Sequence, residues 1–199
     1  MPSTRDLRRR IKSISNTAQI TKAMEMVAAS KMRKAQQSAL AGRPYASLLN
    51  TVLTEVTSAA GDFNHPLLEN REVKNRAIVV VSTDKGLCVG LNSNLIREAL
   101  KFDRETTVYV AAGKKAAQLL ARGKRKLVAE FSYKDAPLFS EARDICKCAR
   151  DLFLEGMVDR VDLLYTHFIS TLTQKPELRP FLPLGELKAV EAGFATSEA

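Results

Sequence analysis

LRRRIKSISNTAQITKAMEMVAASKMRKAQQSAL, residues Leu7–Leu40, is almost unbroken helix-forming sequence, and the same composition extends from Arg5 to about Ala59. At 1.5 Å per residue, roughly 55 helical residues extend about 80 Å, about twice the diameter of a compact globule of this chain length. We therefore predict a helix that protrudes or passes through something else. Pro44 is expected to kink or interrupt this helix, and helical spacing resumes over Ala46–Val56.

The predicted helix carries a heptad seam. One row of side chains steps by seven from Leu7 and a second row steps by seven from Ile11, which is the spacing of a coiled coil. Most of these side chains are small, so a facing helix can approach closely, but they bury little apolar surface at about 0.8 kcal/mol per methylene. We call the following residues the shaft seam: Leu7, Ile11, Ile14, Ala18, Thr21, Ala28, Met32 and Ala35.

The positive charge of the chain is concentrated in this helix. The net charge is +9, and the segment from Met1 to Pro44 holds ten Lys or Arg against Asp6 and Glu25. A solvated helix face is the simplest explanation of such a run, but methionines at Met24, Met26 and Met32 lie among the charges and suit adaptable contacts. The composition favours a surface that meets an acidic neighbour or a polyanion.

The rest of the chain alternates between strand and helix patterns. Arg76–Ser82 has the composition of a strand buried on both faces, and the alternation predicts a small, parallel-rich, Rossmann-like α/β domain behind the long coiled-coil-type helix. We expect domains at 1–62, 63–185 and 186–199, the last a short tail. The further strands are expected at Thr107–Ala112, Lys126–Phe131, Arg160–Phe168 and Leu178–Leu184, with a turn at Gln174–Pro176, and the helices at Ser93–Lys101, Lys114–Arg122 and Ser140–Glu155.

The loops of this domain lack the phosphate-binding patterns. Gly86 and Gly90 do not have the spacing of a dinucleotide fingerprint, and the stretch around Gly113 lacks both the first glycine and the hydroxyl of a P-loop. Gly113 is expected to ease a strand-to-helix turn. Asp84 beside Lys85 is explained equally by a local ion pair or by an outward contact with a partner.

No catalytic or metal-binding constellation is evident. His65 and His167 have no ligand-type residues at metal spacing, and Cys146 and Cys148 project about 200° apart around a helix. The three cysteines, with Cys88, are expected to be reduced thiols in a cytosolic compartment. We predict no cofactor, no metal and no active site in this chain.

Three stretches resemble the gamma subunit of F-type ATP synthase. The first runs from Ile20 to Lys34, with Arg43–Tyr45 after it; the second runs from Val80 to Asn92; the third joins Phe168–Thr171 to Leu182–Leu184. They occur in the family order and together span nearly the whole chain. Val89 departs from the family pattern, which has a second glycine there.

The resemblance implies a central-stalk rotor that turns inside the ring of alpha and beta subunits and contacts the epsilon subunit, the delta subunit within the complex and the c-ring. It implies that Lys22, Met24 and Glu25 lie against the acidic lever of a beta subunit. It places a foot or epsilon contact at Asp84, Lys85, Gly86, Leu87 and Cys88. The expected location is the cytoplasmic face of the bacterial inner membrane, without membrane insertion.

Family members end in a second long helix that winds around the first, and this sequence stops before such a helix. A fragment, a naturally shortened form, or a mate supplied by another chain each explains its absence, and the intact seam favours a fragment. The main alternative function is a basic nucleic-acid-binding module. Against it, the basic segment has no aromatic residue before Tyr45 and its charges run all round the helix. A phosphate-binding α/β enzyme is a further alternative.

Overall fold

A computed structural model describes residues 3–59, 65–88, 90–133 and 137–184. The chain divides into two units, Met1–Val52 and Leu53–Ala199. Val89 and the predicted tail 186–199 lie outside the described residues. Among the described residues, none of the helices combines the length and hydropathy needed to cross a membrane.

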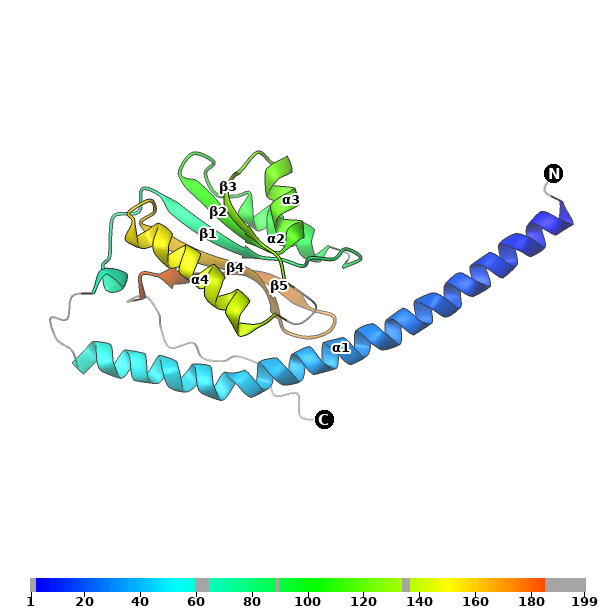
Figure 1. Cartoon of the computed structure of the whole chain (residues 1–199), viewed down its shortest axis with the longest axis horizontal. Helices are drawn as coiled ribbons and strands as arrows, with labels where there is room; N and C mark the ends of the chain where they lie inside the picture. The colour runs from blue at the N-terminus through cyan, green and yellow to red at the C-terminus, as the bar shows by residue number, and fades with distance from the viewer. Residues whose placement is uncertain (1–2, 60–64, 89, 134–136, 185–199) are drawn as a thin grey trace. The chain divides into compact units, whose positions relative to one another are not determined.

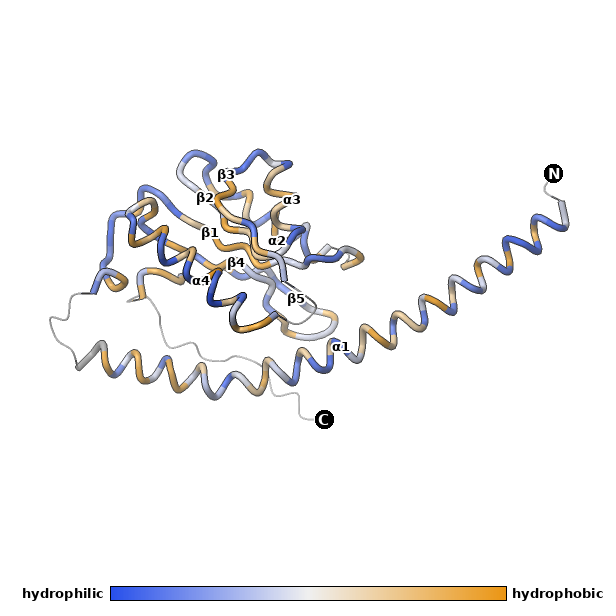
Figure 2. The backbone as a smooth tube through the Cα atoms, viewed as in Figure 1, coloured by the Kyte–Doolittle hydropathy of each residue, from blue (hydrophilic) through white to orange (hydrophobic). Residues whose placement is uncertain are grey.

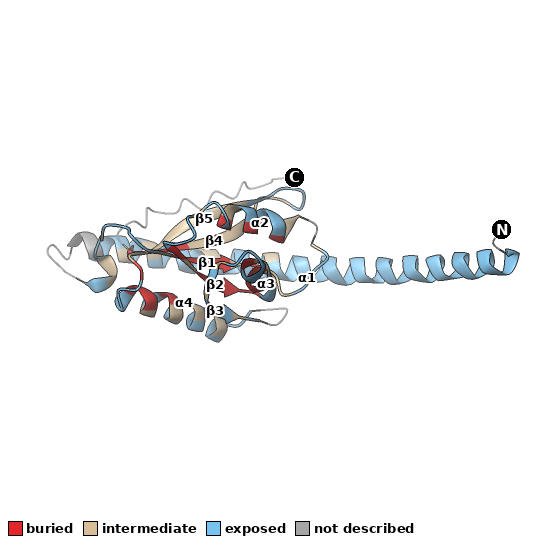
Figure 3. Ribbon diagram, turned by 90° about the horizontal axis from the view of Figure 1, so that it is seen from above, coloured by how far each residue is buried: buried red, intermediate tan, exposed pale blue. Residues whose placement is uncertain are grey.

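Helix α1, Thr4–Ala59, is continuous over 56 residues and includes Pro44 (Figure 1). The predicted continuation beyond the proline is therefore confirmed. Polar and apolar residues alternate along the helix (Figure 2), and almost all of its described side chains are exposed (Figure 3). Hydroxyl groups within it bond to backbone carbonyls one turn earlier, as when Thr21 Oγ1 donates to Thr17 O at 2.8 Å. These bonds are local and bury no apolar surface. Because the side chains of the helix are also exposed, it has no core of its own.

The α/β unit is a five-stranded sheet in the order β3-β2-β1-β4-β5. β1, β2, β3 and β4 are parallel, and β5 is antiparallel to β4. This confirms the predicted parallel-rich α/β class. The elements are η1 Pro66–Leu68, β1 Arg76–Val81, α2 Leu91–Ala99, β2 Thr107–Ala112, α3 Lys114–Arg122, β3 Lys126–Phe131, α4 Phe139–Leu154, β4 Arg160–Phe168 and β5 Gln174–Leu182.

The sheet is covered on both faces. α2 and α3 pack over a core that includes Ile78, Tyr109 and Leu120, whereas α4 packs over a core that includes Val79 and Phe153. Figures 1 and 3 show these layers, with the buried residues concentrated in the central strands and on the inner sides of the helices. The unbroken apolar run of β1 follows from this arrangement, because a central parallel strand is buried on both sides.

Two elements, β5 and α2, were predicted with wrong bounds at both ends. β5 begins at Gln174, so the predicted turn residues Gln174–Pro176 belong to the strand, and the turn lies at Ser170–Thr173, closed by reciprocal backbone bonds between those two residues. An edge strand tolerates Pro176 because one side of its backbone needs no ladder partner. α2 begins two residues earlier than expected, at Leu91, which places Asn92 inside the helix.

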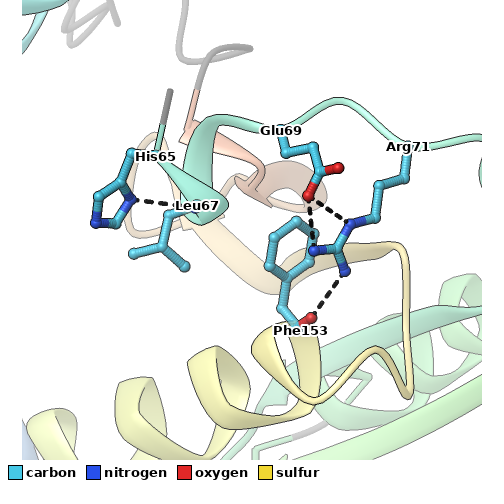
Figure 4. A network of polar contacts seen from close by, with 5 residues as sticks. All are labelled: His65, Leu67, Glu69, Arg71 and Phe153. Atoms are coloured by element: carbon cyan, nitrogen blue, oxygen red, sulfur yellow. Dashed lines mark hydrogen bonds and ion pairs between the residues drawn. The ribbon is translucent and has the colours of Figure 1, made fainter. Parts of the chain in front are cut away.

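The chain between α1 and β1 is fastened to the α/β unit. Arg71 donates from Nη1 to the carbonyl oxygen of Phe153 at 3.0 Å, lies 4.7 Å from the centre of the Phe153 ring and pairs with Glu69 (Figure 4). His65 Nδ1 accepts a bond from the Leu67 backbone at 3.2 Å. We call residues 65–75 the strap. The Phe153 carbonyl at the end of α4 thus accepts a bond from the strap in addition to the one from the Gly156 backbone at 3.2 Å.

The end of the strap is bound to the turn before β4. The Asp159 carboxylate accepts backbone bonds from Asn75 at 2.8 Å and Lys74 at 3.0 Å, and the Asp159 N–H donates to Asn75 O at 2.9 Å. The bonds from Asn75 and Lys74 hold the pKa of Asp159 below 3.8, although burial opposes them. One residue beyond, Arg76 and Arg160 flank the buried Asp162, with Nη1 of Arg76 3.2 Å from Oδ2 and Nε of Arg160 2.9 Å from Oδ1. Oδ2 has no hydrogen-bond donor among the described residues, so the Arg76 contact is an ion pair only.

Gly113 holds the junction between β2 and α3. Its φ is +116°, and a Cβ there would overlap the carbonyl and hydroxyl oxygens of Ser82. Ser82 Oγ accepts a bond from Ala116 N at 2.8 Å in the first turn of α3. The expectation that Gly113 eases a strand-to-helix turn is confirmed, and the structure adds that the missing side chain lets the end of β1 approach that turn.

We predict that Gly113→Ala costs at least about 3 kcal/mol of unfolding free energy, because backbone strain and a backbone overlap add together. Gly156→Ala is the matched control: Gly156 also has a positive φ, +72°, but nothing lies within 4 Å of its added Cβ. We expect the control to cost about 1–2 kcal/mol. Urea unfolding of the full chain measures both, and equal costs would contradict the proposed close approach.

The Asp159 contacts predict a pH dependence. A carboxyl whose folded pKa is lowered stabilises the fold above its unfolded pKa, and this contribution is lost as the pH falls through the folded pKa. We expect Asp159→Asn to be less stable than wild type at neutral pH, and the difference to shrink as the pH is lowered from about 5 to about 2. Glu155→Gln, an exposed carboxylate nearby, is the control. Urea midpoints across this range test it, and a constant difference would refute the assignment.

Candidate functional site

The shaft seam lies on the surface of α1. All eight of its residues are exposed, with Ile11 67%, Ile14 68% and Leu7 45% accessible. No described residue covers this row, although branched and long apolar side chains of this kind normally lie in a core. The seam is therefore a continuous apolar and small-residue surface that is available to a facing helix.

The predicted lever-contact residues form one turn of the same helix. Lys22, Met24 and Glu25 are all exposed, and Met24 is 55% accessible. Neither Lys22 nor Glu25 forms an ion pair with a residue that the structure describes. The turn thus presents one cation, one anion and one thioether to its surroundings. Their assignment to a beta-subunit contact stays a prediction.

The loop after β1 is built around Asp84. Its carboxylate accepts bonds from the backbone of Lys114 at 2.8 Å and of Tyr133 at 3.2 Å. The Tyr133 hydroxyl in turn donates to Ser82 O, and burial, followed by the negative charges of Asp84 and Glu141, raises the pKa of Tyr133. Asp84 therefore joins the ends of β1 and β3 to the start of α3, an internal role that the sequence did not indicate.

The same loop holds Leu87 outward. Asn92, only 8% exposed, donates from Nδ2 to Thr83 Oγ1 at 2.8 Å and to Cys88 Sγ at 3.0 Å, which fixes both ends of the loop. Between them Leu87 has a φ of +61° and is 97% exposed. A bulky residue in the left-handed region is uncommon and suggests a constrained role. Of the five predicted contact residues, Asp84, Lys85, Gly86, Leu87 and Cys88, the middle three are exposed, and their assignment to a partner contact stays a prediction.

The side chains that could bind a metal are not clustered among the described residues. These residues contain no group of three His, Cys, Asp or Glu side chains arranged around one point. Cys88, Cys146 and Cys148 are free thiols, and burial raises the pKa of Cys146 and of Cys148. A raised thiol pKa reduces the thiolate fraction near neutral pH, so these two residues lack the activation of a nucleophilic cysteine.

A polar cluster on β4 and β5 was not predicted from the sequence. Glu177 Oε1 accepts a bond from Arg179 Nε at 2.5 Å. Glu177 Oε2 accepts a bond from the Tyr165 hydroxyl at 3.1 Å and lies 3.4 Å from His167 Nδ1. Burial raises the pKa of Glu177, but the hydrogen bond and charge of Arg179, with smaller effects of Tyr165 and His167, outweigh it, and the net pKa is lowered. Glu177 lies ten residues from His167 in sequence. Only the antiparallel register brings Glu177 opposite Tyr165 and close to His167.

Similarity to known proteins shows the family to which this chain belongs. The family model described as ATP synthase matches residues 3–198. The chain is 45% identical to the ATP synthase gamma chain of Methylacidiphilum infernorum over 99% of its own length and 69% of that protein, and 47% identical to the one of Opitutus terrae over 96% and 65%.

A solved structure of the mitochondrial ATP synthase central stalk and c-ring of Tetrahymena thermophila contains a chain similar to this one. It matches with a TM-score of 0.66 and 26% identity, over 82% of this chain and 72% of that chain. The sequence thus spans about two thirds of the length of its curated relatives, 69% and 65% for the two above. Because the family model covers almost all of it and these relatives are so similar, the chain belongs to the family of ATP synthase gamma chains.

Proposed function

We propose that this chain is the central-stalk rotor subunit of an F-type ATP synthase. In this role it couples ion-driven rotation of the c-ring to conformational change in the catalytic beta subunits, without an active site of its own. The observation that carries the proposal is α1: a 56-residue helix whose apolar seam is exposed, in a chain of the gamma family. Such a helix needs other chains to cover it, and a stalk inside a ring of subunits provides that cover.

The proposed mechanism requires only that the rotor contacts each beta subunit differently. A rotor that lies differently against each beta subunit favours a different conformation in each, and its rotation moves these preferences around the ring. Torque then acts as a coupling free energy between ion flow and nucleotide binding. The chain contributes shape and charge to this process, and the chemistry of ATP is performed by the ring.

The proposed lever contact involves Lys22, Met24 and Glu25. Exposed ion pairs are worth about 0.2–1 kcal/mol each, so Lys22 can exchange partners as the helix turns. Met24 offers a flexible apolar side chain that adapts to several geometries. Their exposure in α1 supports this role.

The remaining partners follow from the same proposal. The loop Asp84–Cys88, led by the exposed Leu87, is proposed to meet the epsilon subunit or the foot of the stalk, and the complex also includes the delta subunit and the c-ring. The proposed location is the cytoplasmic face of a bacterial inner membrane, reached through these partners. The division into a shaft, 1–62, an α/β domain, 63–185, and a tail, 186–199, belongs to the proposal, with a second shaft helix as the mate of the seam.

Assembly is the direct test. We expect this chain, co-expressed with alpha and beta subunits, to elute with their ring and to change its ATP hydrolysis rate, because α1 supplies the stalk surface. A version without residues 3–52 is the control and should remain outside the ring. Size-exclusion chromatography and an ATPase assay give both readouts. If neither this chain nor a version extended by a second helix joins the ring, the rotor proposal is wrong.

The lever contact makes a graded prediction. Lys22→Gln removes one exchangeable pair, so we expect the rotor-dependent hydrolysis rate to change by less than about fivefold, the equivalent of about 1 kcal/mol. Met24→Glu should change it more, since it places a carboxylate against an acidic lever. Lys34→Gln is the matched control, because Lys34 lies about 120° around the helix from Lys22. Equal effects at positions 24 and 34 would argue against this contact.

A further inference from the structure

The α4 side of the α/β unit contains an open groove that the rotor proposal does not use. It has a volume of about 400 Å³ and lies between α4, η1 and the end of β5. Leu67, Phe181 and Leu184 supply apolar surface to it, and each is only half-buried. No described residue covers this surface, whereas the apolar residues under α2 and α3 are enclosed.

The α4 wall of the groove is cationic. Arg143, Lys147 and Arg150 line it and are all exposed. Their spacing of four and three residues places them within about 60° of one another around the helix axis, so they form one stripe. None of the described residues that line the groove is acidic.

The cations of the stripe form only exposed, weak ion pairs with neighbouring described residues. Arg150 pairs with Asp151 at 2.7 Å and Arg143 lies 3.9 Å from Asp144, both at the surface. Lys147 forms no ion pair with any residue in the described ranges. Surface pairs contribute about 0–1 kcal/mol, so a stronger anionic partner can replace them.

We propose that this groove docks an acidic, amphipathic helical segment of another subunit of the complex, its apolar face on Phe181 and Leu184 and its carboxylates along the Arg143–Arg150 stripe. An apolar strip with a cationic border is the complement of such a helix. An open groove between exposed side chains suits a peptide segment better than an enclosed small molecule. The inference rests on the proposed function, because the partner is sought within the assembled complex.

The test uses a photo-crosslinking amino acid at Lys147 in the purified complex. We expect illumination to join this position to another subunit, at a segment that is net acidic and has apolar residues at three- and four-residue spacing. A crosslink to lipid or detergent, to residues of this chain, or to a basic segment would overturn the proposal. So would the absence of any crosslink in an intact complex.

Charge reversal supplies an independent readout. Arg143→Glu with Arg150→Glu should lower the Lys147 crosslink yield at least about fivefold and remove its decrease with added salt, because both depend on the cationic stripe. The matched control is Arg97→Glu with Arg122→Glu, two exposed arginines on the helices of the opposite sheet face, and it should leave the yield unchanged. Equal losses in both double variants would overturn the proposal.

Failure of the two proposals can be distinguished. If the complex with the control variant elutes intact and hydrolyses ATP but the crosslink is absent, only the groove assignment is wrong. If the wild-type chain and its extended version never enter a complex, the rotor function is wrong and the groove proposal falls with it.

Discussion

A single helix cannot cover its own apolar side chains, and this constraint governs the whole chain. Ile11, Ile14 and Met24 each remain more than half exposed in α1, because a single helix has no second apolar surface of its own to pack against. Stability must then come from elsewhere. The α/β unit provides its own core, and we propose that partner chains bury the seam of α1.

The strap, residues 65–75, lies between α1 and the sheet in sequence and is bound to the α/β unit at two points. Arg71 binds the last turn of α4, and Asp159 binds the strap just before β1. Beyond it, Arg76 and Arg160 flank Asp162 at the point where β1 and β4 begin side by side. A force applied to the strap would act through these contacts on the central strands of the sheet, and a close-packed interior transmits force with little deformation. This is the mechanical property that a proposed rotor needs.

The sequence predicted what local patterns determine. Continuous apolar residues in β1, helix formers in α1 and the turn at Gly113 each have one structural solution, so the fold class and most elements followed. The start of β5 did not, because Pro176 indicates a turn locally and is accepted only because β5 is an edge strand.

Contacts in the candidate site that the sequence did not indicate have the same origin. Asp84 accepts bonds from Lys114 and Tyr133, which lie 30 and 49 residues away in sequence. Glu177 lies near His167 only through the register of β4 and β5. Side chains whose partners are distant in sequence carry no local signal. The exposed residues Lys22 and Met24 were identified through family resemblance, and their proposed partners lie on other chains.

The energetics of the exposed surfaces fit a part that moves. A contact that must form and break at each step cannot rely on buried ion pairs, since separating one leaves an unpaired charge and costs about 3–5 kcal/mol. Exposed pairs such as those available to Lys22, together with small seam residues, have low individual energies and can be exchanged one at a time. The buried polar contacts, around Asp162 and Asn92, lie within the α/β unit. Strong interactions thus hold the unit rigid, and weak ones are left at the surfaces that we propose slide.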